Sequence, residues 1–280
     1  GKETRRRIDE SLEGLRALRS VSEGAVLFDI TPHAIYTCTK ETYEIARDVS
    51  VSEGISLHTH ASESLYEVNQ SYKEHNMSPI AYLHSLGALT HRSNIAHVVQ
   101  AKEGDIDIFK NTGASIIHNP SSNCKLGNGI APISNYLANS INVALGTDDS
   151  SSNNTLDMFK EMRLAAMISA ASTHNPIAIT PYDILSMATI NGAKALNRDK
   201  DCGTLEVGKD ADITLIDIDK PHLSPLNNPF SAIIYCANSA DVDCVMIKGN
   251  IVYKDKTCTY IDEEKTNREL ISRWNTILHR

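Results

Sequence analysis

Histidine and aspartate residues stand at the ends of short apolar segments, in positions from which their side chains can bind a metal ion. His60 closes the segment GISLHTH, His97 lies in NIAHVV, and Asp148 ends INVALGTD. Neutral imidazoles and a carboxylate that converge, with one coordination position left to water, are typical of a catalytic metal site. We therefore expect His60 and Asp148 to be metal ligands, with His97 as a third ligand or as a hydrogen-bond partner beside them.

Glu63 is placed to move protons beside such a metal. It lies three residues after His60, just beyond the end of the same apolar segment, so it can lean over the site without being a ligand. A carboxylate in that position can carry a proton between water and a substrate atom. The alternative is that Glu63 and Asp148 only begin or cap helices, and the run DDSSSNN is good capping material. For Asp148 the sequence supports the two roles equally.

The segments that carry these residues alternate with helical sequence. One histidine at a strand end is most often structural, but four successive segments here end on histidine and a fifth ends on aspartate. Apolar strands that alternate with helices predict a parallel α/β sheet or barrel, and barrel sites form where successive strand ends meet. The predicted strands cover residues 25 to 30, 54 to 60, 94 to 99, 114 to 119 and 141 to 148, with His33, His58, His60, His97, His118 and Asp148 at their ends.

Both ends of the chain depart from this alternation. Residues 3 to 19 have the apolar period of an amphipathic helix. From about residue 199, β-rich runs separated by Gly or Asp predict an antiparallel domain, and PFSAIIYC (229 to 236) is one of its strands. The predicted organisation is a partial (β/α) barrel over 1 to 198, part of a small β domain over 199 to 260, and a closing helix over 261 to 280. The apolar side of that helix carries Leu270, Trp274, Ile277 and Leu278.

The composition excludes several classes of protein. With 280 residues, 41% of them hydrophobic and 22% charged, the chain is in the globular range. A net charge of -8 lacks the basic patch that binds nucleic acid, and no apolar run of about 18 residues predicts a membrane span. The six cysteines form no CxxC pair, which is typical of reduced thiols and predicts a cytoplasmic protein.

Six longer motifs occur in order along the chain. They are HTHASE (58 to 63), NIAHVV (94 to 99), IIHNPSSNCKLGNGIAP (116 to 132), VALGTDDSSSNNTLDMFKEMRLA (143 to 165), MATINGAKAL (187 to 196) and GTLEVGKDADITLID (203 to 217). Together they resemble the amidohydrolase superfamily, and within it the branch of S-adenosylhomocysteine and methylthioadenosine deaminases. The similarity runs from about residue 25 to 255. It implies an α/β fold, a (β/α)8 metallo-hydrolase barrel with a small β-sandwich-like domain.

The resemblance also assigns roles to individual residues. It implies that His60 and Asp148 bind one divalent metal ion, which His97 can join as a ligand. It implies catalytic roles for Glu63, His97 and Asp148, and substrate contacts for His33, Glu63 and Asp148. His118 is expected to support the site. His58 is not expected to be a ligand, because the family ligand is the histidine of the HxxE motif. Zinc is the expected metal, although iron and manganese accept the same ligand types.

The implied reaction is the hydrolytic deamination of an adenosine-type nucleoside, a small-molecule partner. The metal lowers the pKa of bound water, Asp148 accepts a proton from this water, and Glu63 protonates the ring nitrogen. Ammonia is then released, and the product is of the inosine type. 5'-Methylthioadenosine, S-adenosylhomocysteine and 5'-deoxyadenosine are the expected substrates. A guanine deaminase or an s-triazine or chloro-hydrolase shares this chemistry and is an alternative. A truncated non-catalytic fragment or subunit is the alternative from another class.

The sequence departs from the family pattern at its beginning. The superfamily's first strand carries an HxH pair well ahead of the motif PHAIYT, but only 32 residues precede His33. Five strands are predicted where a barrel needs eight. We therefore expect the chain to be the C-terminal part of a longer enzyme, with its open sheet edges covered by a companion segment or by copies in a homo-oligomer. The alternative that His58 and His60 are the HxH pair leaves too few strands after them.

Three single residues also differ from the family pattern. Gln100 stands where many members have a second histidine, Ile35 replaces a proline, and Asp149 replaces a glycine. The extra carboxylate of Asp149 either perturbs the site or caps the next helix. None of these changes removes an expected ligand.

Overall fold

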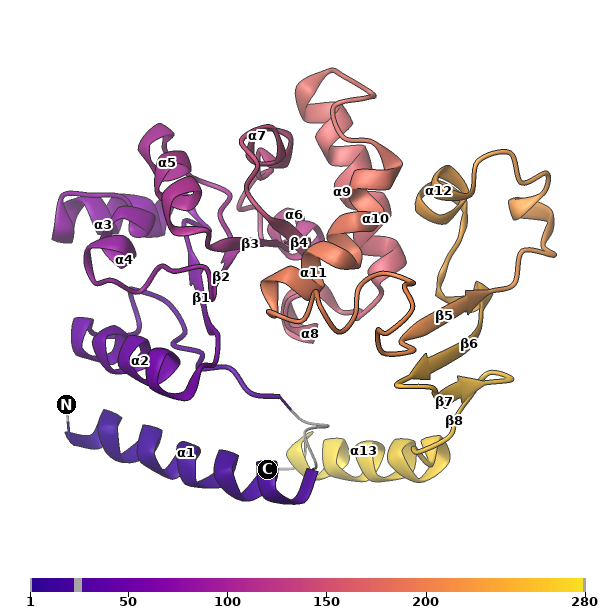
Figure 1. Ribbon diagram of the computed structural model, residues 1–280, viewed down its shortest axis with the longest axis horizontal. Coiled ribbons are helices and arrows are strands. Elements are labelled where there is room, and N and C mark those ends of the chain that lie inside the picture. The colour runs from indigo at the N-terminus through magenta and orange to yellow at the C-terminus, as the bar shows by residue number, and fades with distance from the viewer. Residues whose placement is uncertain (1, 23–26, 279–280) are drawn as a thin grey trace.

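Four parallel strands form the central sheet of the protein. The computed structural model describes residues 2–22 and 27–278. Within them, β1 (Leu57–Ala61), β2 (Ser93–His97), β3 (Ser115–His118) and β4 (Val143–Leu145) pair in the order β1-β2-β3-β4. All three pairings are parallel, so every strand ends at the same edge (Figure 1). The predicted alternating α/β architecture is confirmed, and in the described residues the sheet is open.

Helices connect the strands of this sheet. The helix α2 (Lys40–Glu53) precedes β1, and α9 (Met158–Thr173) follows β4. The other helices of this half are α3 (Leu65–His75), α4 (Pro79–Ser85), α5 (Glu103–Thr112), α6 (Pro120–Lys125), α7 (Ile133–Ala138), α8 (Ser150–Asn153), α10 (Pro181–Ala188) and α11 (Ile190–Ala195). Most of their first turns are capped by a side chain, as at Ser64 before α3 and Thr180 before α10.

The predicted strand over residues 25 to 30 is only partly formed. Residues 25 and 26 lie outside the described residues. Ile30 makes an isolated parallel bridge to Leu57, and Ala34 makes another to His60. This segment therefore follows the edge of β1 without forming a strand, since Pro32 has no amide hydrogen to donate to a ladder. Of the five predicted strands, four are therefore present and the first is only a segment with isolated bridges.

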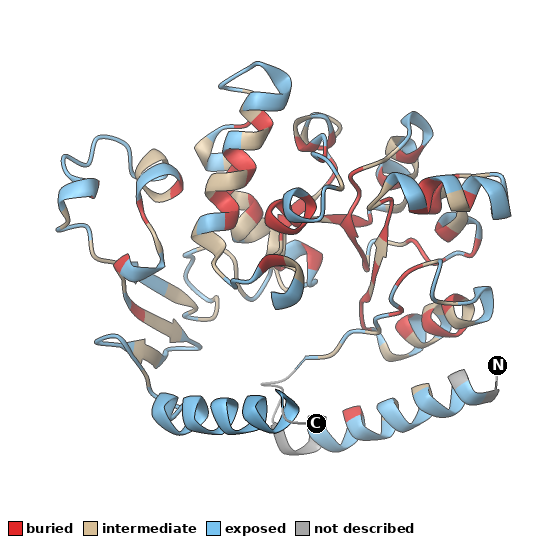
Figure 2. Ribbon diagram, turned by 180° about the vertical axis from the view of Figure 1, so that it is seen from behind, coloured by how far each residue is buried: buried red, intermediate tan, exposed pale blue. Residues whose placement is uncertain are grey.

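The apolar core lies between one face of the sheet and the helices. Leu57, Ile95, Ile116 and Val143 point to this side and are at most 1% exposed. Figure 2 shows the strands and the inward sides of the helices as the buried part of the molecule. Because successive side chains alternate between the two faces of a strand, His58 and His60 lie on the other face, and both are only partly buried.

A second sheet lies beyond α11 and is antiparallel. It consists of β5 (Ile213–Ile216), β6 (Val242–Ile247), β7 (Asn250–Lys254) and β8 (Thr257–Cys258). The predicted strand over 229 to 236 is wrong, because α12 (Pro229–Ser231) and η2 (Ala232–Cys236) are helical. Asn228 caps this turn by accepting the amide hydrogen of Ser231 at 3.1 Å. The 3-10 turns η1 (Pro221–Leu223) and η3 (Ser239–Asp241) complete this region.

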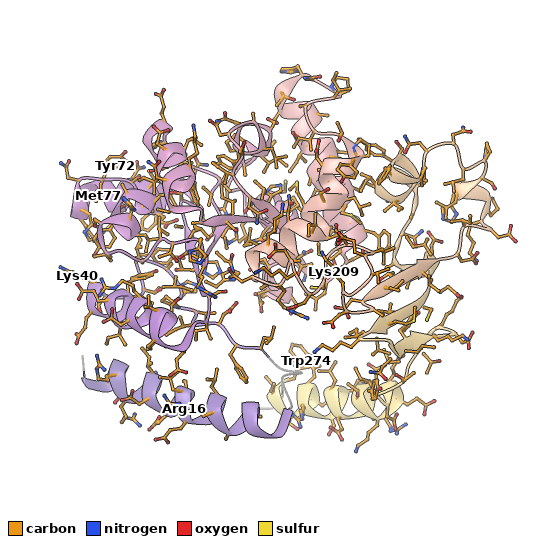
Figure 3. The ribbon with its side chains drawn as sticks, viewed as in Figure 1. Arg16, Lys40, Tyr72, Met77, Lys209 and Trp274 are labelled. Carbon is orange, nitrogen blue, oxygen red and sulfur yellow. The ribbon has the colours of Figure 1, made fainter. Side chains whose placement is uncertain are left out.

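The helices α1 (Lys2–Ser22) and α13 (Glu263–Leu278) lie along one edge of the molecule (Figures 1 and 2). Arg16 of α1, labelled in Figure 3, donates to Glu53 of α2 at 2.9 Å. The predicted apolar side of α13 is present but uncovered, since Leu270 and Trp274 are 63% and 57% exposed. None of the helices in the described ranges is long and apolar enough to cross a membrane.

Candidate metal centre and active site

Three of the predicted site residues meet at the C-terminal edge of the parallel sheet. His60 is in β1, His97 ends β2, and Asp148 follows β4. One ligand atom of each lies within 4.8 Å of the others. The two imidazole rings are 5.4 Å apart at an angle of 26°, and His97 Nε2 is 4.0 Å from Asp148 Oδ2. The sheet therefore brings two imidazoles and one carboxylate to a common point.

Both imidazoles are oriented so that the Nε2 atom can face a metal. The Nδ1 atom of His60 lies 2.7 Å from the main-chain oxygen of His33. The Nδ1 atom of His97 lies 2.8 Å from Oδ1 of Asn123, which is fully buried. Because these oxygens only accept, each Nδ1 carries the hydrogen and each Nε2 keeps its lone pair. Such outer hydrogen bonds fix the tautomer and the direction of metal-binding histidines.

The backbone at the strand ends is bent to aim these side chains. His97 pairs with Ala61, so regular alternation would place its ring on the opposite face from His60. His97 and Val98 instead have φ values of 73° and 45°, and Asp148 has 61°, all in the left-handed region. Such conformations are costly for residues with a side chain and are concentrated at functional sites. They explain how His97 reaches the same side as His60.

Asp148 is held as an ionised carboxylate. Ser122 Oγ donates to its Oδ2 at 2.5 Å, and the amide of Asp149 donates to its Oδ1 at 2.7 Å. Desolvation alone would raise the pKa of Asp148, but these hydrogen bonds outweigh it and leave the pKa below its ordinary value. Asp149 caps α8 by accepting the amide hydrogen of Ser151 at 2.7 Å. The capping role that the sequence left open therefore belongs to Asp149 and not to Asp148.

Glu63 lies beside the three ligand candidates. Its Oε2 is 3.8 Å from Nε2 of His97, and its side chain is 17% exposed. Its Oε1 accepts a hydrogen bond from Nδ2 of Asn128 at 2.7 Å. Glu63 is not one of the three grouped ligands, so its position fits the predicted role in moving protons.

His33, His58 and His118 surround this group in different ways. His33 is exposed, and its ring is 4.9 Å from that of His60. Burial, followed by the nearby His60 and His97, lowers the pKa of His58 to about 4. Burial lowers the pKa of His118 to about 3, so its ring is neutral, and neither ring nitrogen has a hydrogen-bond partner among the described residues. The predicted substrate contact of His33 and supporting role of His118 stay predictions.

Several residues that position the site lie within the sequence motifs, but their types and spacing assign them no role. Ser122, Asn123 and Asn128 all belong to the motif IIHNPSSNCKLGNGIAP. Glu161 is fully buried and accepts hydrogen bonds from the amide of Ser121 at 3.0 Å and from Nδ2 of Asn153 at 2.9 Å. It ties the segment before Ser122 to the segment after Asp148. The available signal was the density of polar residues directly after predicted strands, where site loops lie.

Glu67 is another residue that sequence reasoning missed. Its two carboxylate oxygens accept the amide hydrogens of Ser62 at 3.1 Å and Glu63 at 2.8 Å, and thereby fix the turn after β1. Ser64 and Glu67 form the S-x-x-E pattern of a helix start, which was the available signal. Burial raises the pKa of Glu67 to about 7 against the effect of these hydrogen bonds.

The raised pKa of Glu67 predicts a pH-dependent stability. A folded-state pKa above the ordinary value means that the native state binds the proton more tightly, so stability is lost as pH rises from about 4.5 to 7. We expect Glu67→Gln to remove about 2 to 3 kcal/mol of this dependence. Urea unfolding of both proteins at pH 5 and pH 7.5 measures it. If the two proteins lose equal stability between these pH values, Glu67 does not titrate in this range.

Comparison with known proteins shows which family the chain belongs to. Parallel strands that end on imidazoles and a carboxylate are typical of the metal-binding barrel proteins. A model described as the amidohydrolase family matches residues 2–252. The chain therefore belongs to the amidohydrolase family, as its motifs predicted.

Two curated relatives of the chain are named as deaminases. A 5-methylthioadenosine/S-adenosylhomocysteine deaminase of Thermoanaerobacter pseudethanolicus is 40% identical over 263 residues, which are 92% of this chain and 60% of the relative. A 5'-deoxyadenosine deaminase of Methanosphaera stadtmanae is 42% identical over 88% of this chain and 57% of its own length. The chain thus spans about 60% of the length of these curated relatives.

A solved structure extends the similarity to the fold. An adenosine deaminase of Xanthomonas campestris, crystallised with bound zinc, superposes with a TM-score of 0.85 and 32% sequence identity. The superposition covers 89% of this chain and 57% of that structure. The predicted relation to amidohydrolase barrels is confirmed at the level of the fold.

Proposed function

We propose that this protein is a metal-dependent hydrolytic deaminase of adenosine-type nucleosides. The observation that carries the proposal is the convergence of His60, His97 and Asp148 within 4.8 Å, with Glu63 beside them. The named relatives are deaminases of 5-methylthioadenosine, S-adenosylhomocysteine or 5'-deoxyadenosine. These three compounds are the proposed substrates.

The donor set fits one divalent metal ion. Nε2 of His60, Nε2 of His97 and a carboxylate oxygen of Asp148 would hold it, which is the number and kind of protein ligands found in catalytic zinc sites. Zinc is the proposed metal because the similar Xanthomonas campestris structure contains it, while iron and manganese use the same ligand types. When bound, the metal would lower the pKa of a water molecule toward neutrality.

The residues of the chain supply the proton transfers. Asp148 is ionised because its hydrogen bonds lower its pKa, so its carboxylate can take one proton from the attacking water. The water oxygen forms a bond to the ring carbon that bears the amine, and Glu63 gives a proton to the adjacent ring nitrogen. The carbon–nitrogen bond then breaks, and ammonia leaves with the proton that Asp148 accepted. The hydrogen of the new hydroxyl group passes to Glu63 as the carbonyl forms, which restores the proton that Glu63 gave. His97 is placed to orient the water or the ring, and His33 to contact the substrate.

Ammonia release from a panel of compounds tests the proposal. The zinc-loaded protein is expected to deaminate 5'-methylthioadenosine, S-adenosylhomocysteine or 5'-deoxyadenosine to an inosine-type product, and to act more slowly on guanine and on s-triazines. A preference for guanine or a triazine would show that the proposed substrate class, adenosine-type nucleosides, is wrong. Binding of zinc without any ammonia release would support a non-catalytic subunit.

We also propose a cytoplasmic location and assembly into a homo-oligomer. All six cysteines are free thiols, as expected of a reducing compartment. The uncovered apolar side of α13, with Leu270 and Trp274, is a surface that a second copy can bury. Light scattering after size exclusion is expected to give at least a dimer, and a monomer at every concentration would contradict the assembly.

A further inference from the structure

The loop between α6 and α7 places an asparagine against the carboxylate of Glu63. Nδ2 of Asn128 donates to Oε1 of Glu63 at 2.7 Å. Asn128 is partly buried, whereas Gly127 and Gly129 on either side of it are exposed. The loop therefore presents this one side chain to the site.

The two flanking glycines allow the loop to reach Glu63. Gly127 and Gly129 have φ values of 70° and 112°, which residues with a side chain rarely adopt. A Cβ atom at Gly129 would lie 3.3 Å from Nε2 of Gln100. The sequence GNG is thus suited to a tight turn that packs against the side chain of Gln100.

Gln100 holds the loop in place from the other side. Its Nε2 donates to the main-chain oxygen of Asn128 at 2.7 Å, and its main-chain amide donates to the oxygen of Ser62 at 2.8 Å. Ser62 directly precedes Glu63. Gln100 is therefore hydrogen-bonded both to the residue that contacts Glu63 and to the backbone that carries Glu63.

We propose that Gln100 and Asn128 are positioning residues for Glu63. Gln100 fixes Asn128, and Asn128 occupies Oε1 of Glu63 with a donated hydrogen bond. Oε2 is then the oxygen free to exchange a proton, and it is the one that lies 3.8 Å from Nε2 of His97, toward the metal ligands. The glutamine that departs from the family pattern at position 100 thereby has a function. The proton exchange rests on the proposed deaminase function, whereas the positioning of the carboxylate does not.

The positioning is tested first without any activity. The side-chain amide protons of Asn128, observed by NMR in protein labelled with ¹⁵N-asparagine, are expected to exchange with water more slowly than those of the exposed Asn111. Gln100→Ala and Glu63→Ala are each expected to accelerate this exchange at least several-fold, while Gln70→Ala leaves it unchanged. Gln70 is the matched control, because its amide also donates to a glutamate, Glu74, but on the surface of α3. Equal exchange in all four proteins would overturn the positioning.

The catalytic consequence is tested by kinetics of the zinc-loaded protein. Asn128→Ala is expected to lower kcat about 10- to 100-fold, as other supporting residues do, with KM and zinc content within about threefold of the unmodified protein. Gln100→Ala is expected to act in the same direction by a smaller factor. In a Glu63→Gln background, Asn128→Ala is expected to change kcat less than twofold, because no carboxylate proton remains to be positioned.

The outcomes separate this inference from the proposed function. If the unmodified protein releases no ammonia from any nucleoside, the proposed function fails while the exchange measurement still decides the positioning. If Asn128→Ala lowers kcat equally in both backgrounds, Asn128 acts on the structure and not through Glu63, and the inference is wrong.

Discussion

Glu63→Gln is expected to lower kcat by about 10²- to 10⁴-fold, the range that a positioned acid or base contributes. Glutamine has nearly the shape of glutamate and can still accept the hydrogen bond from Asn128, which is 2.7 Å from Oε1 in the native site. It has no acidic proton to give to a ring nitrogen. The substitution therefore removes proton transfer and leaves the surrounding contacts in place. Steady-state ammonia release measures the loss.

The zinc content of this variant separates its effect from damage to the metal centre. Glu63 is outside the group formed by His60, His97 and Asp148, so Glu63→Gln is expected to retain the same zinc per chain. Glu263→Gln on α13 is the matched control, because this glutamate is exposed and distant in sequence from every site residue. A loss of less than tenfold at Glu63, with zinc retained, would exclude it as the acid.

The parallel sheet and its polar edge follow from local sequence alone. Apolar segments of strand length that alternate with helical sequence predict β1 to β4, and parallel strands must end at one edge. His60, Glu63 and Asp148 could be assigned to that edge because each lies at or just beyond a strand end. Their residue types then predict a metal site, since imidazole nitrogens and carboxylate oxygens are the ligands of many catalytic zinc ions.

Other features could not be predicted because they depend on contacts between distant segments. Strand alternation places His97 opposite His60, and only the left-handed φ of 73° brings it back. The pairing of Asn128 with Glu63 joins residues 65 positions apart. No local pattern encodes either feature, because both arise when loops pack against each other.

The helical turn over 229 to 236 begins with residues that favour a helix start, although the residues after them favour a strand. Asn228 and Pro229 are the preferred residues at the cap and first position of a helix. The β-branched and aromatic residues after them favour a strand when read alone. Packing decides the outcome, because Ile234 is fully buried and its main-chain oxygen and that of Ala237 accept hydrogen bonds from Arg163 of α9.

Asp148→Asn is expected to abolish most of both zinc binding and activity. The substitution removes a carboxylate ligand, so zinc affinity is expected to fall by more than the about 10- to 100-fold that changes outside the ligand shell cause. It also removes the proton acceptor, which Ser122 and the Asp149 amide keep ionised by lowering its pKa. We expect kcat/KM to fall by about 10³-fold or more even when zinc is supplied in excess.

Zinc titration by competition with a chromophoric chelator, together with ammonia release, measures these two effects. Asp149→Asn is the matched control, since it changes the adjacent carboxylate and asparagine is an equally good helix cap. It is expected to keep native zinc affinity and activity within about twofold, because its amide still donates to position 148. If Asp148→Asn binds zinc as tightly as Asp149→Asn does, then Asp148 is not a ligand and the metal must be held without this carboxylate. In that case Asp148 would act only as the base, and activity would fall while zinc stayed bound.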